Sequence, residues 1–181
     1  MGFASPTLRL AQDQYRTIVG HSYDGLPNEA CGLLIGPVVD DEPRGTVTEV
    51  RPCRNEDESA LTYRLDSRDF MAALRAAEDR GEGLVGCWHS HTHTDAYPSP
   101  TDIEQAKWYP EWAYVIVSLR DGDPVLRAYR IRDGALTASA LILLTMVVAF
   151  ADRGPGIGSQ PCALRTLSVA GVGPLSLWWA S

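Results

Sequence analysis

The sequence predicts one mixed α/β domain. Short apolar runs bounded by turn residues alternate with segments in which apolar residues recur at helical spacing, so strands and helices are interleaved along the chain. No tandem repeat is present. The 181 residues suffice for a single sizeable core but are too few for two ordinary domains.

The first half of the chain is expected to contain two helices and several strands. Gly25-Leu-Pro27 interrupts the first helix, and Ala30–Gly36 is an apolar run of the kind found in buried strands. Ser67 is the expected N-cap of the second helix and Gly81 its terminator. The expected order is a strand over 7–10, a helix over 11–23, strands over 30–36, 46–51 and 60–65, and a helix over 68–80.

The second half continues with a buried strand over 84–88. Ser99 precedes Pro100 and an acidic turn, which predicts the start of a short helix that runs to about Trp108. Two strands over 113–119 and 125–131 flank a Gly-containing turn and form an expected hairpin. Three aromatic residues are expected in the core or the hairpin: Trp108, Trp112 and Tyr114.

Composition narrows the possible partners. The net charge of -7 leaves no basic stripe for nucleic acid and no polybasic patch for a membrane surface. The first ten residues lack the pattern of a signal peptide, so we expect a cytoplasmic protein. Four widely spaced cysteines without a C-x-x-C pair predict free, mostly buried thiols: Cys31, Cys53, Cys87 and Cys162.

The composition changes beyond Leu136. We therefore expect a domain over 7–136 and an apolar, low-charge tail over 137–181. Residues 138–151 are nearly all apolar but fall short of the roughly 18 residues that a transmembrane helix needs. A packed C-terminal helix is one interpretation. A misassigned extension is the other, since Arg165 is the single charged residue in 154–181.

Histidines crowd the stretch that follows the strand over 84–88, which reads His89-Ser-His-Thr-His93. Side chains alternate along a strand, so His89 and His91 lie on one side of the sheet and can share one cation. Asp102 follows a Pro-rich turn at the start of a helix, from which it can supply an oxygen ligand. Two nitrogens and one carboxylate form a zinc site with an open fourth position, the arrangement of catalytic sites.

Two further residues are predicted to act at this site. Glu29 stands at the mouth of the strand over 30–36, and its carboxylate is the candidate base for the attacking water. Ser99 lies between the histidines and Asp102, and its hydroxyl is the candidate hydrogen-bond donor to the oxyanion that forms when a carbonyl is attacked.

The spacing from Glu29 through His89-Ser-His91, seven residues, Ser99, two residues and Asp102 resembles the motif of the JAMM (MPN+) metalloprotease family. The resemblance covers roughly Leu8 to Leu136. It implies an α/β fold of the cytidine-deaminase-like type, in which helices flank a mixed, curved β-sheet. It also implies Zn²⁺ bound by His89, His91 and Asp102, Glu29 as general base, Ser99 as oxyanion donor, and hydrolysis of a peptide or isopeptide bond.

Within this family the chain is most similar to stand-alone bacterial members. Asn28–Gly36, Thr62–Asp66 and His93–Asp102 resemble the actinobacterial Mec-type peptidases. This implies a ubiquitin-like sulfur carrier protein as substrate, from which a C-terminal cysteine is released in cysteine biosynthesis. Only 59 residues separate Glu29 from His89, which leaves little room for the insertions of eukaryotic deubiquitinases.

Several alternatives remain at this point. An isopeptidase acting on other ubiquitin-like conjugates and a non-catalytic MPN scaffold both belong to the same family.

Two other metal hydrolases are excluded by the sequence. Amidohydrolase barrels need a longer chain, of about 250 residues, and a metallo-β-lactamase-like site needs Asp and His where this chain has His93 and Thr94. His93 and Tyr97 are assigned to substrate contacts. The oligomeric state and the identity of the carrier stay open.

Overall fold

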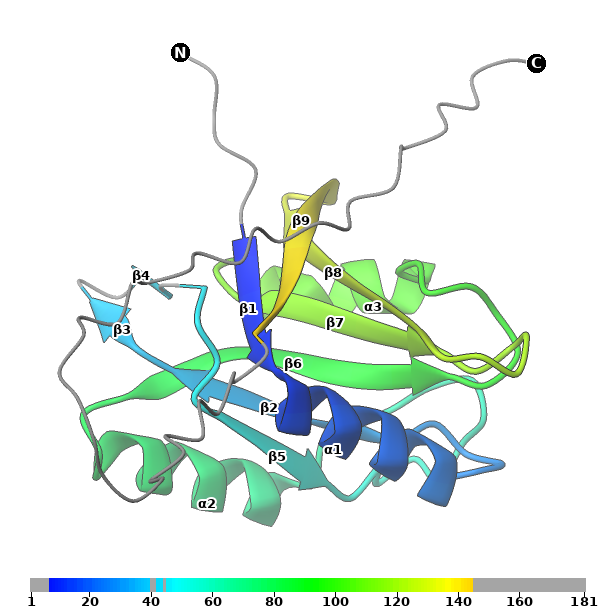
Figure 1. Ribbon diagram of the computed structural model, residues 1–181, viewed down its shortest axis with the longest axis horizontal. Coiled ribbons are helices and arrows are strands. Elements are labelled where there is room, and N and C mark those ends of the chain that lie inside the picture. The colour runs from blue at the N-terminus through cyan, green and yellow to red at the C-terminus, as the bar shows by residue number, and fades with distance from the viewer. Residues whose placement is uncertain (1–6, 40–41, 44, 145–181) are drawn as a thin grey trace, which may run out of the picture. The chain divides into compact units, whose positions relative to one another are not determined.

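The computed structural model describes residues 7–39, 42–43 and 45–144. A seven-stranded sheet forms its centre, in the order β1-β9-β8-β7-β6-β2-β5 (Figure 1). The elements are β1 (Thr7–Ala11), α1 (Gln12–Asp24), β2 (Cys31–Gly36), β3 (Val38–Val39), β4 (Glu42–Pro43), β5 (Glu49–Cys53), α2 (Ser67–Glu78), β6 (Gly83–His91), α3 (Pro100–Gln105), the 3-10 helix η1 (Ala106–Trp108), β7 (Ala113–Ser118), β8 (Val125–Arg132) and β9 (Ala135–Leu144).

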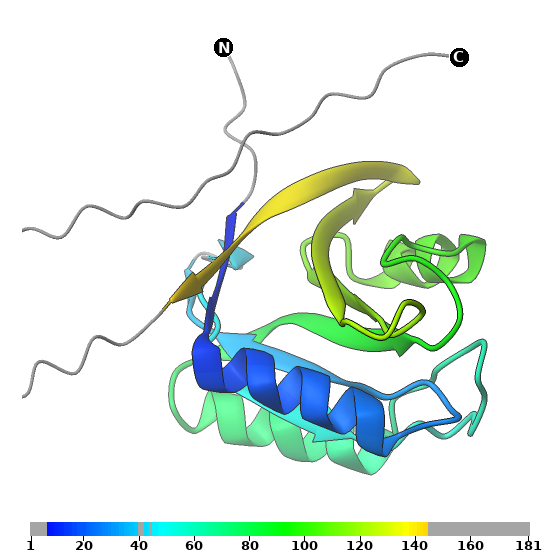
Figure 2. The same cartoon turned by 45° about the vertical axis from the view of Figure 1, so that its right-hand side comes forward.

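The sheet is mixed and curled. β6 lies between β2, to which it is antiparallel, and β7, to which it is parallel. β8 and β9 arch away from β6 and return to β1, which pairs in parallel with β9 (Figure 2). The expected mixed, curved sheet flanked by helices is confirmed.

Each face of the sheet has its own apolar core. Ile18 of α1 packs with Leu34 and Trp88 on one face, and Ala73 and Ala77 of α2 pack on the other. The second core also contains residues of η1, β7 and β8: Ala106, Tyr114, Ile116, Tyr129 and Ile131. Since side chains alternate along a strand, the position of a β6 residue decides which of these two layers it faces.

The prediction of a strand over 60–65 is wrong. Residues 54–66 form an irregular segment with one isolated bridge between Asn55 and Leu65. The backbone groups of this segment bond to the side chain of Asn55 and to the chain around Glu29 instead of to a neighbouring strand. The strand expected over 46–51 is present but shifted, because β5 spans Glu49–Cys53.

Two smaller expectations also need correction. Asp66, not Ser67, is the N-cap of α2, and its carboxylate accepts hydrogen bonds from the backbone N–H groups of Arg68 and Asp69. A carboxylate satisfies these free donors and also interacts favourably with the helix dipole. Trp108 is 82% exposed instead of packed in the core, whereas Trp112 and Tyr114 are buried as expected.

The apolar segment after Leu136 begins as a strand and not as a helix. β9 runs to Leu144 and fills the place between β8 and β1, so sheet pairing decided the conformation of a run whose apolar composition suits either structure. The remainder of the expected helix and the rest of the tail lie outside the described residues. In the described part of the chain no helix has both the length and the hydropathy to cross a membrane.

Three of the four cysteines are buried free thiols, as expected: Cys31, Cys53 and Cys87. Burial raises the pKa of Cys53 and of Cys87 to about 12, and it also raises that of Cys31. Thiols with such pKa values are poor nucleophiles at neutral pH. Cys162 lies outside the described residues.

Two glycine-to-alanine substitutions should change stability in opposite directions. A Cβ at Gly86 would lie 2.2 Å from the backbone carbonyl oxygen of Ala113 on β7, so Gly86→Ala should lower the free energy of unfolding by about 1–3 kcal/mol. A Cβ at Gly20 in α1 meets nothing within 4 Å, so Gly20→Ala should raise it by about 0.5–1 kcal/mol. Urea unfolding measures both, and equal effects would contradict the close β6–β7 approach.

Candidate active site

The end of β6 carries both histidines of the predicted pair. His89 lies opposite Cys31 of β2 and Ile116 of β7 in the strand register, and His91 lies opposite Ser118. Both share the face of Cys87, which belongs to the core under α2. Their exposed fractions are 1% and 5%. The alternation inferred from the sequence therefore places both imidazoles in one buried layer.

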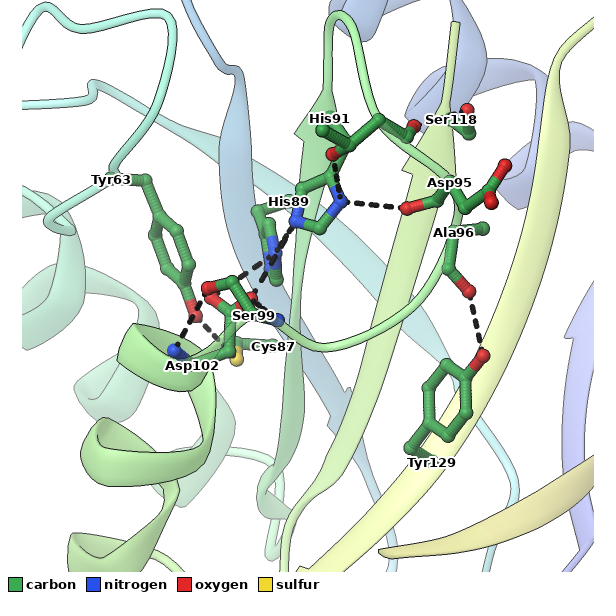
Figure 3. A network of polar contacts seen from close by, with 11 residues as sticks. Tyr63, Cys87, His89, His91, Asp95, Ala96, Ser99, Asp102, Ser118 and Tyr129 are labelled. Atoms are coloured by element: carbon green, nitrogen blue, oxygen red, sulfur yellow. Dashed lines mark hydrogen bonds and ion pairs between the residues drawn. The ribbon is translucent and has the colours of Figure 1, made fainter. Parts of the chain in front are cut away.

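Asp102 reaches the histidines from the first turn of α3. The backbone N–H of Ser99 donates to Asp102 Oδ2 at 2.7 Å, and the backbone N–H of Asp102 donates to Ser99 Oγ at 3.2 Å. This reciprocal capping box begins the helix and fixes the carboxylate. Figure 3 shows Asp102 and Ser99 at the start of the helix, facing His89 and His91.

The ligand-capable atoms of the three residues converge. His89 Nε2 lies 3.1 Å from His91 Nε2. Asp102 Oδ1 lies 3.3 Å from the first nitrogen, and Asp102 Oδ2 lies 3.5 Å from the second. Two ligands of a tetrahedral zinc ion, with bonds of about 2.0–2.1 Å, are about 3.3 Å apart. The set therefore fits one small divalent cation, and in the described part of the chain it is the only such His, Cys, Asp and Glu cluster.

The hydrogen bonds of His91 leave its ligand atom free. Nδ1 lies 2.8 Å from the carbonyl oxygen of Asp95 and 3.0 Å from Thr94 Oγ1. A carbonyl oxygen only accepts, so Nδ1 carries a proton. In the neutral ring Nε2 then keeps its lone pair for a cation, and in the protonated ring Nε2 donates to Asp102. Burial acts to lower the pKa of His91, but hydrogen bonds to Asp102 and Asp95 outweigh burial and raise it.

The charge of Asp102 is strongly favoured. Burial acts to raise the pKa of this carboxyl, but the charge of His89 and hydrogen bonds from His89, His91 and Ser99 hold it well below its usual range. The site therefore offers a fixed negative charge beside two imidazoles, a buried setting that would favour a bound cation.

Glu29 lies directly before β2 and is 6% exposed. Its backbone N–H donates to the carbonyl oxygen of Ser59 at 2.8 Å, and its carbonyl oxygen accepts from Asn55 Nδ2 at 3.0 Å. Burial raises the pKa of the Glu29 carboxyl to about 7, while His91 acts to lower it and Asp102 to raise it. A carboxylate with this proton affinity suits a general base at neutral pH.

Ser90 joins the segment of Glu29 to the metal-ligand strand. Its side chain lies on the opposite face from the histidines, and Ser90 Oγ accepts from the backbone N–H of Ala30 at 2.8 Å. The backbone N–H of Ser90 donates to the carbonyl oxygen of Ala30 at the same distance. Ser90 thus bonds twice to the residue that follows Glu29, and these bonds help to hold Glu29 in register with His89 and His91.

His93 and Tyr97 lie outside the buried cluster. His93 is exposed, and its Nδ1 lies 2.6 Å from Thr92 Oγ1. Tyr97 is 54% exposed and its ring meets Tyr129 edge-on. Both lie in the loop between β6 and α3, which is fixed by a 2.6 Å bond from the Tyr129 hydroxyl to the carbonyl oxygen of Ala96. Their assignment to substrate contacts stays a prediction.

Sequence reasoning missed two residues that surround the site. The ring of Tyr63 stacks on the imidazole of His89, with centroids 4.3 Å apart and planes 18° from parallel. The side chain of Asn55 bonds to the backbone on both sides of Tyr63 and to Glu29. Tyr63 falls in the strand predicted over 60–65, and no sequence pattern signals a stacking contact between residues so far apart in the chain.

Comparisons with known proteins identify the family of this chain. The family described as prokaryotic homologs of the JAB domain matches residues 11–132. This chain belongs to the JAB domain family. The matched range includes every predicted ligand as well as Glu29 and Ser99.

Relatives of this JAB domain include named proteases. A CysO-cysteine peptidase of Mycobacterium tuberculosis is 43% identical over 131 residues, which cover 72% of this chain and 86% of that protein. A desampylase of Haloferax volcanii is 38% identical over 119 residues, covering 63% of this chain and 82% of that protein. A solution structure from Desulfitobacterium hafniense, 31% identical, has a TM-score of 0.69 over 77% of this chain and 94% of that one.

The buried carboxyl of Glu29 should make the stability of the metal-free JAB domain depend on pH. Its pKa of about 7 in the folded protein exceeds the ordinary 4.5, so ionisation favours the unfolded chain as pH rises between these values. Relative to wild type, Glu29→Gln should gain up to about 3 kcal/mol in free energy of unfolding from pH 5 to pH 8. Urea unfolding of chelator-treated proteins tests this, and a difference independent of pH would contradict it.

Proposed function

We propose that this JAB domain is a zinc-dependent peptidase that acts at the C-terminus of a ubiquitin-like protein. Its substrate is a sulfur carrier protein joined to cysteine, and the reaction releases cysteine for biosynthesis. The observation that carries the proposal is the buried convergence of His89, His91 and Asp102, with which the buried carboxyl of Glu29 interacts electrostatically through His91 and Asp102. The name of the Mycobacterium tuberculosis relative supports the substrate.

In this proposal His89, His91 and Asp102 hold Zn²⁺, which supplies a Lewis acid for carbonyl chemistry. Glu29 accepts a proton from the attacking water, and its pKa near 7 lets it return that proton to the leaving amine. The hydroxyl of Ser99 has its oxygen occupied by the backbone N–H of Asp102, so its own hydrogen is available to the oxyanion.

The domain predicted over 7–136 carries this activity, and the cytoplasm, a reducing compartment, suits its three buried thiols. His93 and Tyr97 contact the substrate from the loop that precedes α3.

A complete ligand set disfavours a purely non-catalytic scaffold. A second candidate is an isopeptidase on other ubiquitin-like conjugates, which is favoured by the relatives named desampylase and probable TtuB-protein conjugate cleaving protease.

Intact-mass analysis tests the substrate. A ubiquitin-like sulfur carrier that bears an added C-terminal cysteine should lose the mass of one cysteine when incubated with the zinc-loaded protein. Chelator treatment and His91→Ala should both abolish the loss, because each removes the metal. Glu29→Gln should retain zinc and lose turnover. An unchanged carrier mass with zinc bound would redirect the proposal to the isopeptidase candidate.

Ser99→Ala separates the two roles of this side chain. Loss of the cap on α3 should lower the free energy of unfolding by about 1 kcal/mol, and loss of the oxyanion donor should lower kcat by about 10²–10³-fold. Asp66→Ala is the matched control, because it removes the cap of α2 and should leave kcat unchanged. If Ser99→Ala and Asp66→Ala had the same kcat, Ser99 would be a cap only.

A further inference from the structure

The two histidines of the site are held by different means. His91 is oriented by hydrogen bonds from its Nδ1 to Asp95 and Thr94. In metal sites a bond of this kind, on the nitrogen that does not bind metal, normally fixes the ring. His89 has none, because its Nδ1 is buried without a hydrogen-bond partner in the described part of the chain. Its orientation needs another source.

That source is the ring of Tyr63. We propose that Tyr63 is a positioning residue of the metal centre, which fixes the imidazole plane of His89 by stacking in place of a hydrogen bond. The two rings lie 4.3 Å apart and 18° from parallel, and Tyr63 is itself only 6% exposed. Figure 3 shows Tyr63 beside His89. The inference rests on the proposed metal site.

Tyr63 is in turn fixed from both sides. Asn55 Nδ2 donates to the carbonyl oxygen of Thr62 at 3.1 Å, and Asn55 Oδ1 accepts from the backbone N–H of Arg64 at 3.0 Å. The hydroxyl of Tyr63 lies 3.6 Å from Cys87 Sγ. A ring held at its backbone and at its tip cannot tilt easily, so it presents a fixed surface to His89.

The same segment is attached to both halves of the site. Asn55 Nδ2 also donates to the carbonyl oxygen of Glu29, and the carbonyl oxygen of Ser59 accepts from the Glu29 N–H. Near the end of β6, Thr92 Oγ1 donates to the carbonyl oxygen of Ala60 at 3.2 Å. The segment that carries Tyr63 therefore connects Glu29 with the end of β6, the strand that carries His89 and His91.

Stacking also favours the metal-bound imidazole electrostatically. The face of an aromatic ring carries negative charge and attracts a positively charged ring placed over it. An imidazole that donates its lone pair to a divalent cation becomes more positive. Tyr63 thus stabilises the ligated form of His89 as well as its orientation, and removal of the ring weakens metal binding.

Zinc affinity of Tyr63 variants tests the proposal, measured by competition with a chromogenic chelator. Tyr63→Leu keeps an apolar side chain without a ring, and it should weaken zinc binding about 10–100-fold, the range for residues that orient metal ligands. Tyr63→Phe keeps the ring and loses only the weak contact with sulfur, so its affinity should stay within about threefold of wild type. Phe70→Leu is the control: it removes another ring from the same open, mostly aromatic pocket but touches no ligand.

The outcomes separate this inference from the proposed function. Failure of the wild-type protein to bind zinc would overturn the metal centre itself. Wild-type affinity in Tyr63→Leu, or equal losses in the leucine and phenylalanine variants, would overturn the positioning role alone. If Tyr63→Leu does not fold, NMR of the metal-free wild-type protein tests the stacking instead. Cross-peaks between the Tyr63 ring and the His89 imidazole are expected, together with upfield shifts of the His89 ring protons. Their absence would also overturn the role.

Discussion

The rest of the structure depends on one constraint: two buried imidazole nitrogens lie 3.1 Å apart, and each faces an oxygen of Asp102, at 3.3 and 3.5 Å. Lone pairs at these distances repel each other unless a proton or a cation lies between them. Two elements hold these atoms in place. β6, which pairs with β2 and β7, carries the histidines, and α3, whose first turn is capped by Ser99, carries Asp102. The arrangement therefore suits a cation, and the surrounding fold resists its relaxation.

The second buried carboxyl follows the opposite physical rule. Asp102 stays charged because two imidazoles lie beside it, whereas Glu29 sits where burial dominates and its pKa approaches neutrality. The two carboxyls thus acquire different properties from their surroundings: one is held as an anion, and the other can exchange a proton near neutral pH. Burial of Glu29 destabilises the folded metal-free chain at higher pH, so the property that suits catalysis opposes stability.

The parts that could be predicted from sequence are those fixed by local periodicity. Alternation along β6 placed His89 and His91 on one face, and the Ser-Pro-x-Asp pattern placed Asp102 in a first helical turn. The parts that could not be predicted depend on contacts between distant residues. Residues 60–65 have the pattern of a strand, but the side chain of Asn55 bonds to the backbone of Thr62 and Arg64 within them. The apolar composition of residues 135–144 suits either a helix or a strand. They form a strand because they pair with both β8 and β1.

The segment 54–66 also explains how a small domain orders a site without large insertions. Its Ser59 carbonyl accepts from the backbone of Glu29, its Tyr63 stacks on His89, and its Ala60 carbonyl accepts from Thr92 at the end of β6. Each of these contacts uses a different part of the segment, so one short irregular stretch relates Glu29 to the histidines of β6. Irregular backbone is suited to this task because its N–H and C=O groups are not committed to a sheet ladder. A regular strand over the same residues would have directed those groups to a neighbouring strand, away from Glu29 and β6.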